Sequence, residues 1–189
     1  MPSLNSWRRV IFRATMTRAI YRWISPMRAV SNTSPISNLA YIDRLDLLWT
    51  QFDEISIPAA VAEELGAHPD PRSLEAIQTA IQARRIRIAE PADQTLVNLL
   101  LMNLDRGEAH AIALAAELKA GLLLIDEHEG RMTAIRTGVP VTGLLGILLR
   151  AKETGHLPAI KPEIEALRRK ARFFISANLE QRVLREARE

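Results

Sequence analysis

The sequence predicts an α/β fold of three layers (α/β/α), in which helices cover both faces of a central parallel sheet made of short strands. Two observations lead to this fold class. Short apolar runs alternate with helical segments along the chain, as they do in β-α-β units. In addition, residues 122–125 form a wholly apolar run, which is typical of a strand that is covered on both faces.

The predicted strands and helices are separated by turn residues. Strands are expected at residues 29–31, 55–57, 85–89, 122–125 and 139–142. Helices are expected at residues 35–41, 42–48, 59–65, 74–83, 94–104, 108–119, 131–137, 143–154, 163–172 and 176–187. Pro58 favours the start of a helix and Ser176 is a suitable helix cap. Gly107 is expected to end the segment that precedes the helix at 108–119.

Length and composition exclude several classes of protein. A chain of 189 residues with 48% apolar and 25% charged residues is long enough to bury a core and is not disordered. The absence of cysteine excludes disulfides and thiolate zinc sites and is compatible with the expected cytoplasmic location. No apolar run approaches about 18 residues, so no membrane-spanning segment is expected.

Residues 1–28 differ in charge from the rest of the chain. They carry six arginines and no acid, whereas residues 29–189 carry 19 basic and 22 acidic residues. We interpret residues 1–28 as a basic N-terminal extension and residues 29–189 as the domain. Three readings of the extension stay open: a basic amphipathic helix for RNA or a membrane surface, an organellar transit peptide, or a segment upstream of a true translation start at Met16 or Met27.

The chemistry of the domain is expected at one edge of the sheet. In a β-α-β unit the helix runs antiparallel to the strands, so Glu108 at a helix start and Asp126 at a strand exit should meet there. Asn32 and Glu64 also stand at a strand exit or helix start, with Ser34 and Glu127 as neighbours. Carboxylate and amide oxygens suit Mg²⁺ or Mn²⁺, which activate water for attack on phosphodiesters.

Each of these residues also has a purely structural explanation. Asp105 and Glu108 have the spacing of a capping box, Glu64 suits a solvated helix face, and Asn32 suits a helix cap. The four histidines show no spacing typical of a zinc site. The glycines at 143 and 146 favour close packing over phosphate binding. Only the shared location of the oxygen-bearing residues favours a site.

Five segments together resemble a known family. Residues 30–39, 57–65, 104–116, 122–127 and 141–155 resemble, in order and spacing, the DUF3368 branch of the PIN-domain family. That branch is similar to the VapC-type toxins of bacterial toxin-antitoxin pairs, and the resemblance extends over about residues 29–188. It implies a PIN-like α/β/α fold, an acidic pocket for Mg²⁺ or Mn²⁺ and cleavage of single-stranded RNA. It also implies a homodimer and a small cognate antitoxin protein as partner.

The resemblance assigns roles by position. The four acidic positions of the family fall on Asn32, Glu64, Glu108 and Asp126, and its small hydroxyl residue falls on Ser34. Asn32 departs from the family pattern, which has Asp there, so the site loses one negative charge while keeping an oxygen ligand. The resemblance therefore implies metal ligands at all four positions, with Glu64, Glu108 and Asp126 catalytic and with Ser34 and Glu127 in support.

Three functional hypotheses follow. The leading one is a metal-dependent endoribonuclease that acts as a toxin and has no membrane association. Its phosphate contacts are expected from the extension or from a basic helix that carries Arg168, Arg169, Lys170 and Arg172. The second is a catalytically weak PIN module that binds RNA or a protein partner, because of Asn32. The third is an unrelated α/β domain that binds a small ligand at the sheet edge.

Overall fold

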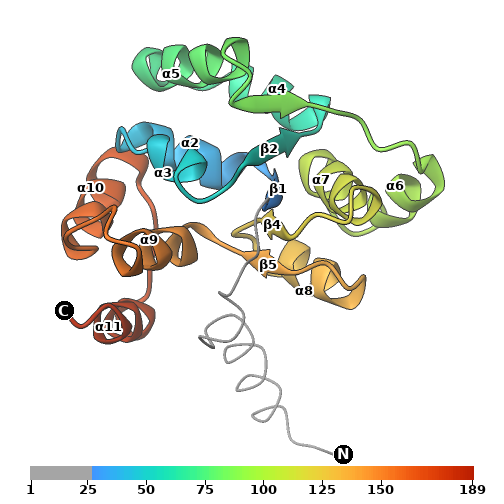
Figure 1. Ribbon diagram of the computed structural model, residues 1–189. Helices are drawn as coiled ribbons and strands as arrows, with labels where there is room; N and C mark the ends of the chain where they lie inside the picture. The colour runs from blue at the N-terminus through green and yellow to red at the C-terminus, as the bar shows by residue number, and fades with distance from the viewer. Residues whose placement is uncertain (1–26) are drawn as a thin grey trace, which may run out of the picture.

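Five parallel strands form one sheet with the order β3-β2-β1-β4-β5 in the computed structural model, which describes residues 27–189 (Figure 1). The strands are short: β1 Arg28–Ser31, β2 Glu54–Ile57, β3 Ile86–Ile88, β4 Leu122–Leu124 and β5 Val141–Thr142. Helices cover both faces of the sheet, so the predicted three-layer α/β/α fold is confirmed.

The helices fall into two groups around the sheet (Figure 1). One face is covered by α6 Gln94–Leu100, α7 Arg106–Glu117 and α8 His128–Arg136. The other core contains residues of α2 Thr33–Tyr41, α3 Asp46–Trp49, α4 Ala59–Gly66, α5 Pro71–Gln82, α9 Leu144–Glu153, α10 Lys161–Ala171 and α11 Ala177–Glu186.

The two cores are separated by the alternation of side chains along the central strands. In β1, Ala29 belongs to the core beneath α2 and α9, whereas Val30 belongs to the core beneath α7. Its neighbour β4 alternates in the same way, with Leu123 facing the α7 side and Leu124 facing the α2 side. Successive strand residues point to opposite faces, so both faces of this sheet must be apolar, as the run at 122–125 predicts.

Most elements differ by a few residues from their predicted bounds, and three differences have a clear cause or consequence. The helix α7 begins at Arg106, so the prediction that Gly107 ends the preceding segment is wrong. Asp105 is the N-cap, and its carboxylate accepts a hydrogen bond from the Glu108 N–H at 2.7 Å, which places Gly107 within the first turn. Asp43 has a positive φ of 59°, so the expected helix at 42–48 is reduced to α3. The strand expected at 139–142 retains only its last two residues.

The predicted extension at residues 1–28 lies outside the described residues except for Met27 and Arg28, and Arg28 opens β1. Within residues 27–189, no helix combines the length and the apolar character needed to cross a membrane.

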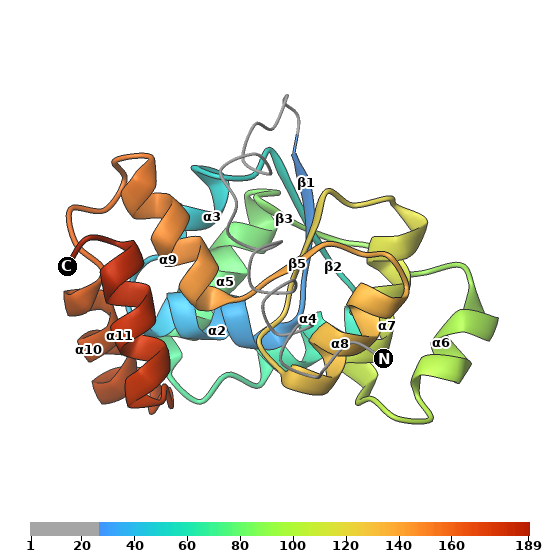
Figure 2. The ribbon, with the colours of Figure 1, turned by 90° about the horizontal axis from the view of Figure 1, so that it is seen from below.

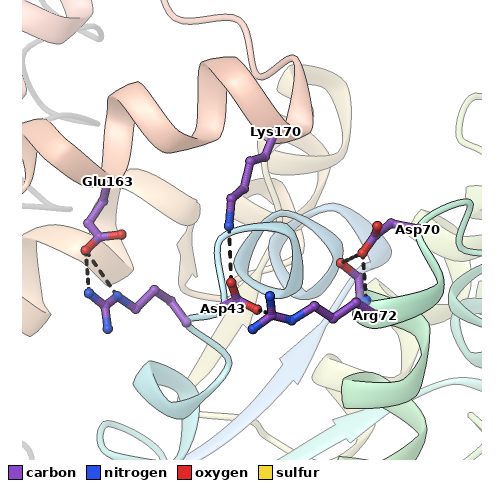
Figure 3. A network of polar contacts seen from close by, with 7 residues as sticks. Asp43, Asp70, Arg72, Glu163 and Lys170 are labelled. Atoms are coloured by element: carbon purple, nitrogen blue, oxygen red, sulfur yellow. Dashed lines mark hydrogen bonds and ion pairs between the residues drawn. The ribbon is translucent and has the colours of Figure 1, made fainter.

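Ion pairs attach α10 to the turn between α2 and α3 (Figure 3). Glu163 is only 8% exposed and accepts two hydrogen bonds from the Arg44 guanidinium, at 2.9 and 3.1 Å. Lys170 lies two turns further along α10, on the same face as Glu163, and pairs with Asp43 at 3.1 Å. Asp43 also pairs with Arg72 at 3.3 Å. The hydrogen bond to Glu163 raises the pKa of Arg44, so the guanidinium stays charged.

We expect the Glu163→Ala variant to lose about 1–3 kcal/mol of unfolding free energy, because Arg44 is left without its acceptor in a partly buried position. The matched control is Lys170→Ala on the same helix, which removes an exposed pair and should cost about 0.5 kcal/mol or less. Urea unfolding followed by circular dichroism measures both. Equal losses for the two variants would contradict a structural role for the buried pair.

Candidate functional site

The carboxyl ends of β1 and β4 place Asn32 and Asp126 at the same edge of the sheet. The Asn32 N–H donates to the Leu124 carbonyl oxygen at 2.9 Å, which continues the pairing of the two strands beyond Ser31. The helix α2 starts directly after Asn32, and α8 starts two residues after Asp126. Figure 2 shows α2 and α8 on the two sides of this edge. Asn32 and Asp126 therefore share the edge at which the sequence places both strand exits.

Glu108 and Glu64 reach the same edge from two helices. Glu108 lies in the first turn of α7 and is 5% exposed, whereas Glu64 lies in α4 and is exposed. A β-carbon built on Gly107 would lie 2.7 Å from Glu64 Oε1 and 3.1 Å from Asn32 Oδ1. Glu64 and Asn32 thus converge on the backbone of Gly107. The hydroxyl of Thr33 donates to the Glu64 carboxylate, a contact that the sequence did not indicate.

Two more glycines make room for the other acids. A β-carbon on Gly130 would lie 2.8 Å from Glu108 Oε1, and one on Gly143 would collide with Asp126 Oδ1. Gly107 and Gly130 belong to the first turns of α7 and α8, and Gly143 is the N-cap of α9. Each of these helix starts therefore leaves space for a polar side chain from a neighbouring element, and residues larger than glycine would displace it.

The side-chain amide of Asn32 has a defined orientation. Its Nδ2 lies 3.5 Å from Glu127 Oε2, and the Ser34 hydroxyl donates to the other oxygen of the same carboxylate. Asn32 Oδ1 is buried and accepts no hydrogen bond from any described residue. Glu127 and Ser34 therefore occupy the nitrogen side of the amide, and the carbonyl oxygen is left on the side of Gly107 and Glu64.

Asp126 is held by one oxygen and has the other free. Its Oδ1 accepts a hydrogen bond from the Leu144 N–H at 2.8 Å, at the start of α9, whereas its buried Oδ2 has no partner within residues 27–189. Burial, with a smaller contribution from Glu127, raises the pKa of Asp126 to about 6. Two groups lower the pKa of Asp126 instead: the Leu144 N–H and the positive charge of Arg131. Arg131 is held by a hydrogen bond from its Nη1 to the Ile125 carbonyl oxygen at 2.9 Å.

Glu108 is also shifted toward its neutral form. Burial raises its pKa to about 7, and the negative charges of Asp105 and Glu127 add to this effect. The edge thus contains two carboxyl groups that are costly to ionise and two buried oxygens without donors. A positive charge placed beside such groups would favour their ionised forms.

The donor set fits a hard cation that keeps part of its water shell. No three His, Cys, Asp or Glu side chains converge into a metal-binding group in the described part of the chain, so a complete cage of protein ligands is absent there. Mg²⁺ is commonly bound by one or two carboxylates and several waters. Glu108, Asp126 and the amide oxygen of Asn32 match this smaller requirement, and all donors are oxygens.

Comparison with protein families identifies the domain. The model of the family described as "DUF3368: PIN domain" matches residues 28–189. The chain belongs to this PIN-domain family. PIN domains are generally nucleases and typically use divalent metals, so the fold is that of a nuclease family. No curated protein matches the chain. The family membership does not support the reading of an unrelated small-ligand domain.

The basic helix of this PIN domain is partly engaged within the fold. Arg168 pairs with the Glu180 carboxylate of α11 at 2.5 Å, and Lys170 pairs with Asp43 (Figure 3). Arg169 and Arg172 are exposed. RNA contacts by these four residues stay a prediction, with Arg169 and Arg172 the more available pair.

The raised pKa values of Glu108 and Asp126 predict a pH-dependent stability for the PIN domain without metal. Between about pH 4 and 7 the folded state binds more protons than the unfolded state, so stability falls as the pH rises through this range. We expect the unfolding temperature in EDTA to drop by on the order of 5 °C between pH 5 and pH 8. Differential scanning calorimetry measures this.

The Glu108→Gln variant should show a smaller drop, because the amide carries no titrating proton. Glu75→Gln, at an exposed position of α5, is the matched control and should behave as the wild type. If the drop is the same in all three proteins, the two carboxyls do not titrate as described.

Proposed function

We propose that this PIN domain is a metal-dependent endoribonuclease and the toxin of a bacterial toxin-antitoxin pair. The observation that carries the proposal is the pair of buried, unpartnered oxygens of Asn32 and Asp126 beside the buried Glu108, at the carboxyl edge of a nuclease-family fold. The RNA substrate, the small antitoxin, the homodimer and the cytoplasmic location rest on the resemblance of the sequence to VapC-type toxins and on its composition.

In this proposal Glu108, Asp126 and the amide oxygen of Asn32 hold Mg²⁺ or Mn²⁺. The cation would supply an activated water and neutralise charge on the scissile phosphate. Glu64, exposed and oriented by Thr33, positions the attacking water from the open side of the edge. Glu127 and Ser34 keep the amide of Asn32 turned so that its oxygen, and not its nitrogen, faces the cation.

The helix starts contribute to binding of the substrate. The N-termini of α2, α7, α8 and α9 lie at the edge that carries the acids, since their caps are Asn32, Asp105, Glu127 and Gly143. Free N–H groups and the helix dipole favour negative charge at such positions. A phosphodiester approaching the edge would meet these groups together with the cation. The acids alone would repel it.

Purified protein should cleave single-stranded RNA in the presence of Mn²⁺ or Mg²⁺ and not in EDTA. We expect Asp126→Asn and Glu108→Gln to lower the cleavage rate by about a hundredfold or more, because each removes a charged ligand from the cation. Glu75→Gln serves as the control and should retain the rate. Gel-based cleavage of a labelled RNA measures all four proteins. Full activity of Asp126→Asn and Glu108→Gln would show that the site lies elsewhere.

A second function is favoured by Asn32, which leaves two buried acids where the family pattern has more charge. In this case the protein binds RNA or a protein partner with little cleavage. We expect Asn32→Asp to raise affinity for Mn²⁺ by about tenfold, because it restores a charged ligand. Isothermal titration with Mn²⁺ and the cleavage assay are run on the same preparations.

The two functions differ in the outcome of this pair of measurements. A wild-type protein that binds Mn²⁺ only weakly and does not cut RNA, together with an active Asn32→Asp variant, supports the weak module. A wild-type protein that cuts RNA, with little change on Asn32→Asp, supports the endoribonuclease with Asn32 as an ordinary oxygen ligand.

A further inference from the structure

A polar cavity of about 350 Å³ lies at the opposite edge of the sheet, at the amino ends of the strands. Its walls come from two connections: the one that joins α3 to β2 and the one that joins α5 to β3. These connections lie at the other end of the strands from Asn32 and Asp126. The cavity is therefore separate from the candidate metal site.

Arginines dominate the charge of this cavity. Arg84 and Arg85 are exposed, and in residues 27–189 their guanidinium groups make no hydrogen bond or ion pair. Arg87 also lines the cavity, but it shares the Glu54 carboxylate with Arg28, at 3.5 and 3.7 Å. Two carboxylates, Asp53 and Glu54, also line the cavity; Glu54 serves both Arg87 and Arg28, whereas Arg84 and Arg85 have no acidic partner among residues 27–189. The three arginines of the lining exceed its two acids by one positive charge, so the cavity suits an anionic ligand.

The backbone fixes the two unpaired arginines at the rim. The Arg84 N–H donates to the Ile81 carbonyl at 3.0 Å and the Arg85 N–H donates to the Ala80 carbonyl at 2.9 Å, which closes the end of α5. Arg84 adopts a positive φ of 57°, as the residue after a helix end commonly does. The positions of both Cα atoms are therefore defined, and only the side chains have to be ordered by a ligand.

Of two further residues of the wall, Trp49 and Gln51, one indicates more than a bare anion. Trp49 offers a partly buried aromatic ring to the cavity. Gln51 is 7% exposed; its Nε2 donates to the Ile147 carbonyl at 3.1 Å, whereas its buried Oε1 accepts no hydrogen bond from the described residues. Because this oxygen is inaccessible to solvent, a ligand in the cavity does not reach it, and the wall's contribution to ligand choice rests on Trp49.

We propose that this amino-edge cavity binds a nucleoside phosphate, with the phosphate on Arg84 and Arg85 and the base against Trp49. Phosphates are favoured partners of guanidinium groups, and aromatic rings stack on bases of any sequence. A volume of about 350 Å³ is in the range of sites for small organic ligands and exceeds the need of inorganic phosphate. The nucleotide is either free or one unit of an RNA strand, and the RNA source rests on the proposed function.

The first experiment measures binding of 5′-AMP, adenosine and inorganic phosphate to the full chain by isothermal titration in EDTA, so that the metal site does not contribute. We expect 5′-AMP to bind more tightly than either of its parts. The Arg84→Ala/Arg85→Ala variant should lose about tenfold in affinity, and Arg84→Lys/Arg85→Lys should recover part of it. Arg136→Ala/Arg185→Ala, at exposed positions of α8 and α11, is the charge-matched control and should bind as the wild type.

The second experiment separates the two sources of the nucleotide by measuring binding of a labelled single-stranded RNA across a series of salt concentrations. If an RNA strand is the ligand, the slope of log affinity against log salt should fall by about 1.4 in the Arg84→Ala/Arg85→Ala variant, since two phosphate contacts are lost. If the slope is unchanged while 5′-AMP affinity falls, the ligand is a free nucleotide.

Three results would overturn the inference: no binding of 5′-AMP, equal binding of 5′-AMP and inorganic phosphate, or equal loss of affinity in the control variant. These results leave the proposed nuclease intact, because RNA cleavage depends on Glu108 and Asp126. Conversely, binding of 5′-AMP with no cleavage of RNA in Mn²⁺ would contradict the nuclease and support the cavity.

Discussion

The parallel pairing of β1 with both of its neighbours is the constraint on which the site depends. Because β1, β2 and β4 run in one direction, their carboxyl ends lie at one edge, and the helices that follow must start there. Asn32 and Asp126 come from strands paired in register, with Ser31 opposite Leu124. If either strand ran the other way, one of the two oxygens would lie at the opposite edge, beside the arginines.

The same arrangement places opposite charges at opposite edges. Helix starts and acids share the carboxyl edge, while Arg84 and Arg85, before β3, lie at the amino edge, where they and Arg87 outnumber Asp53 and Glu54. The acids are buried at a cost, which appears in the raised pKa values of Glu108 and Asp126. The large apolar cores on both faces of the sheet supply the stability that offsets this cost.

Much of this could be predicted from the sequence because it depends on local patterns. The apolar run at 122–125 and the alternation of strands with helices determine the layers, and strand exits determine where Asn32 and Asp126 lie. Other features depend on contacts between distant residues. The orientation of the Asn32 amide requires Glu127, which is 95 positions away, and the space for Glu64 requires Gly107. The prediction for Gly107 is wrong because a glycine in a sequence indicates a helix end as readily as a close approach of another side chain.

Gly107 has a consequence for separating geometry from charge in this protein. Alanine is favoured over glycine by about 1 kcal/mol inside a helix, so a methyl group at this position has no intrinsic penalty to the fold. The methyl group would nevertheless take the space of the Glu64 carboxylate and crowd the Asn32 oxygen. Every acidic and amide side chain would remain, with the same net charge, in a displaced arrangement. A single small residue thus allows the placement of the oxygens to be varied while their chemistry is held constant.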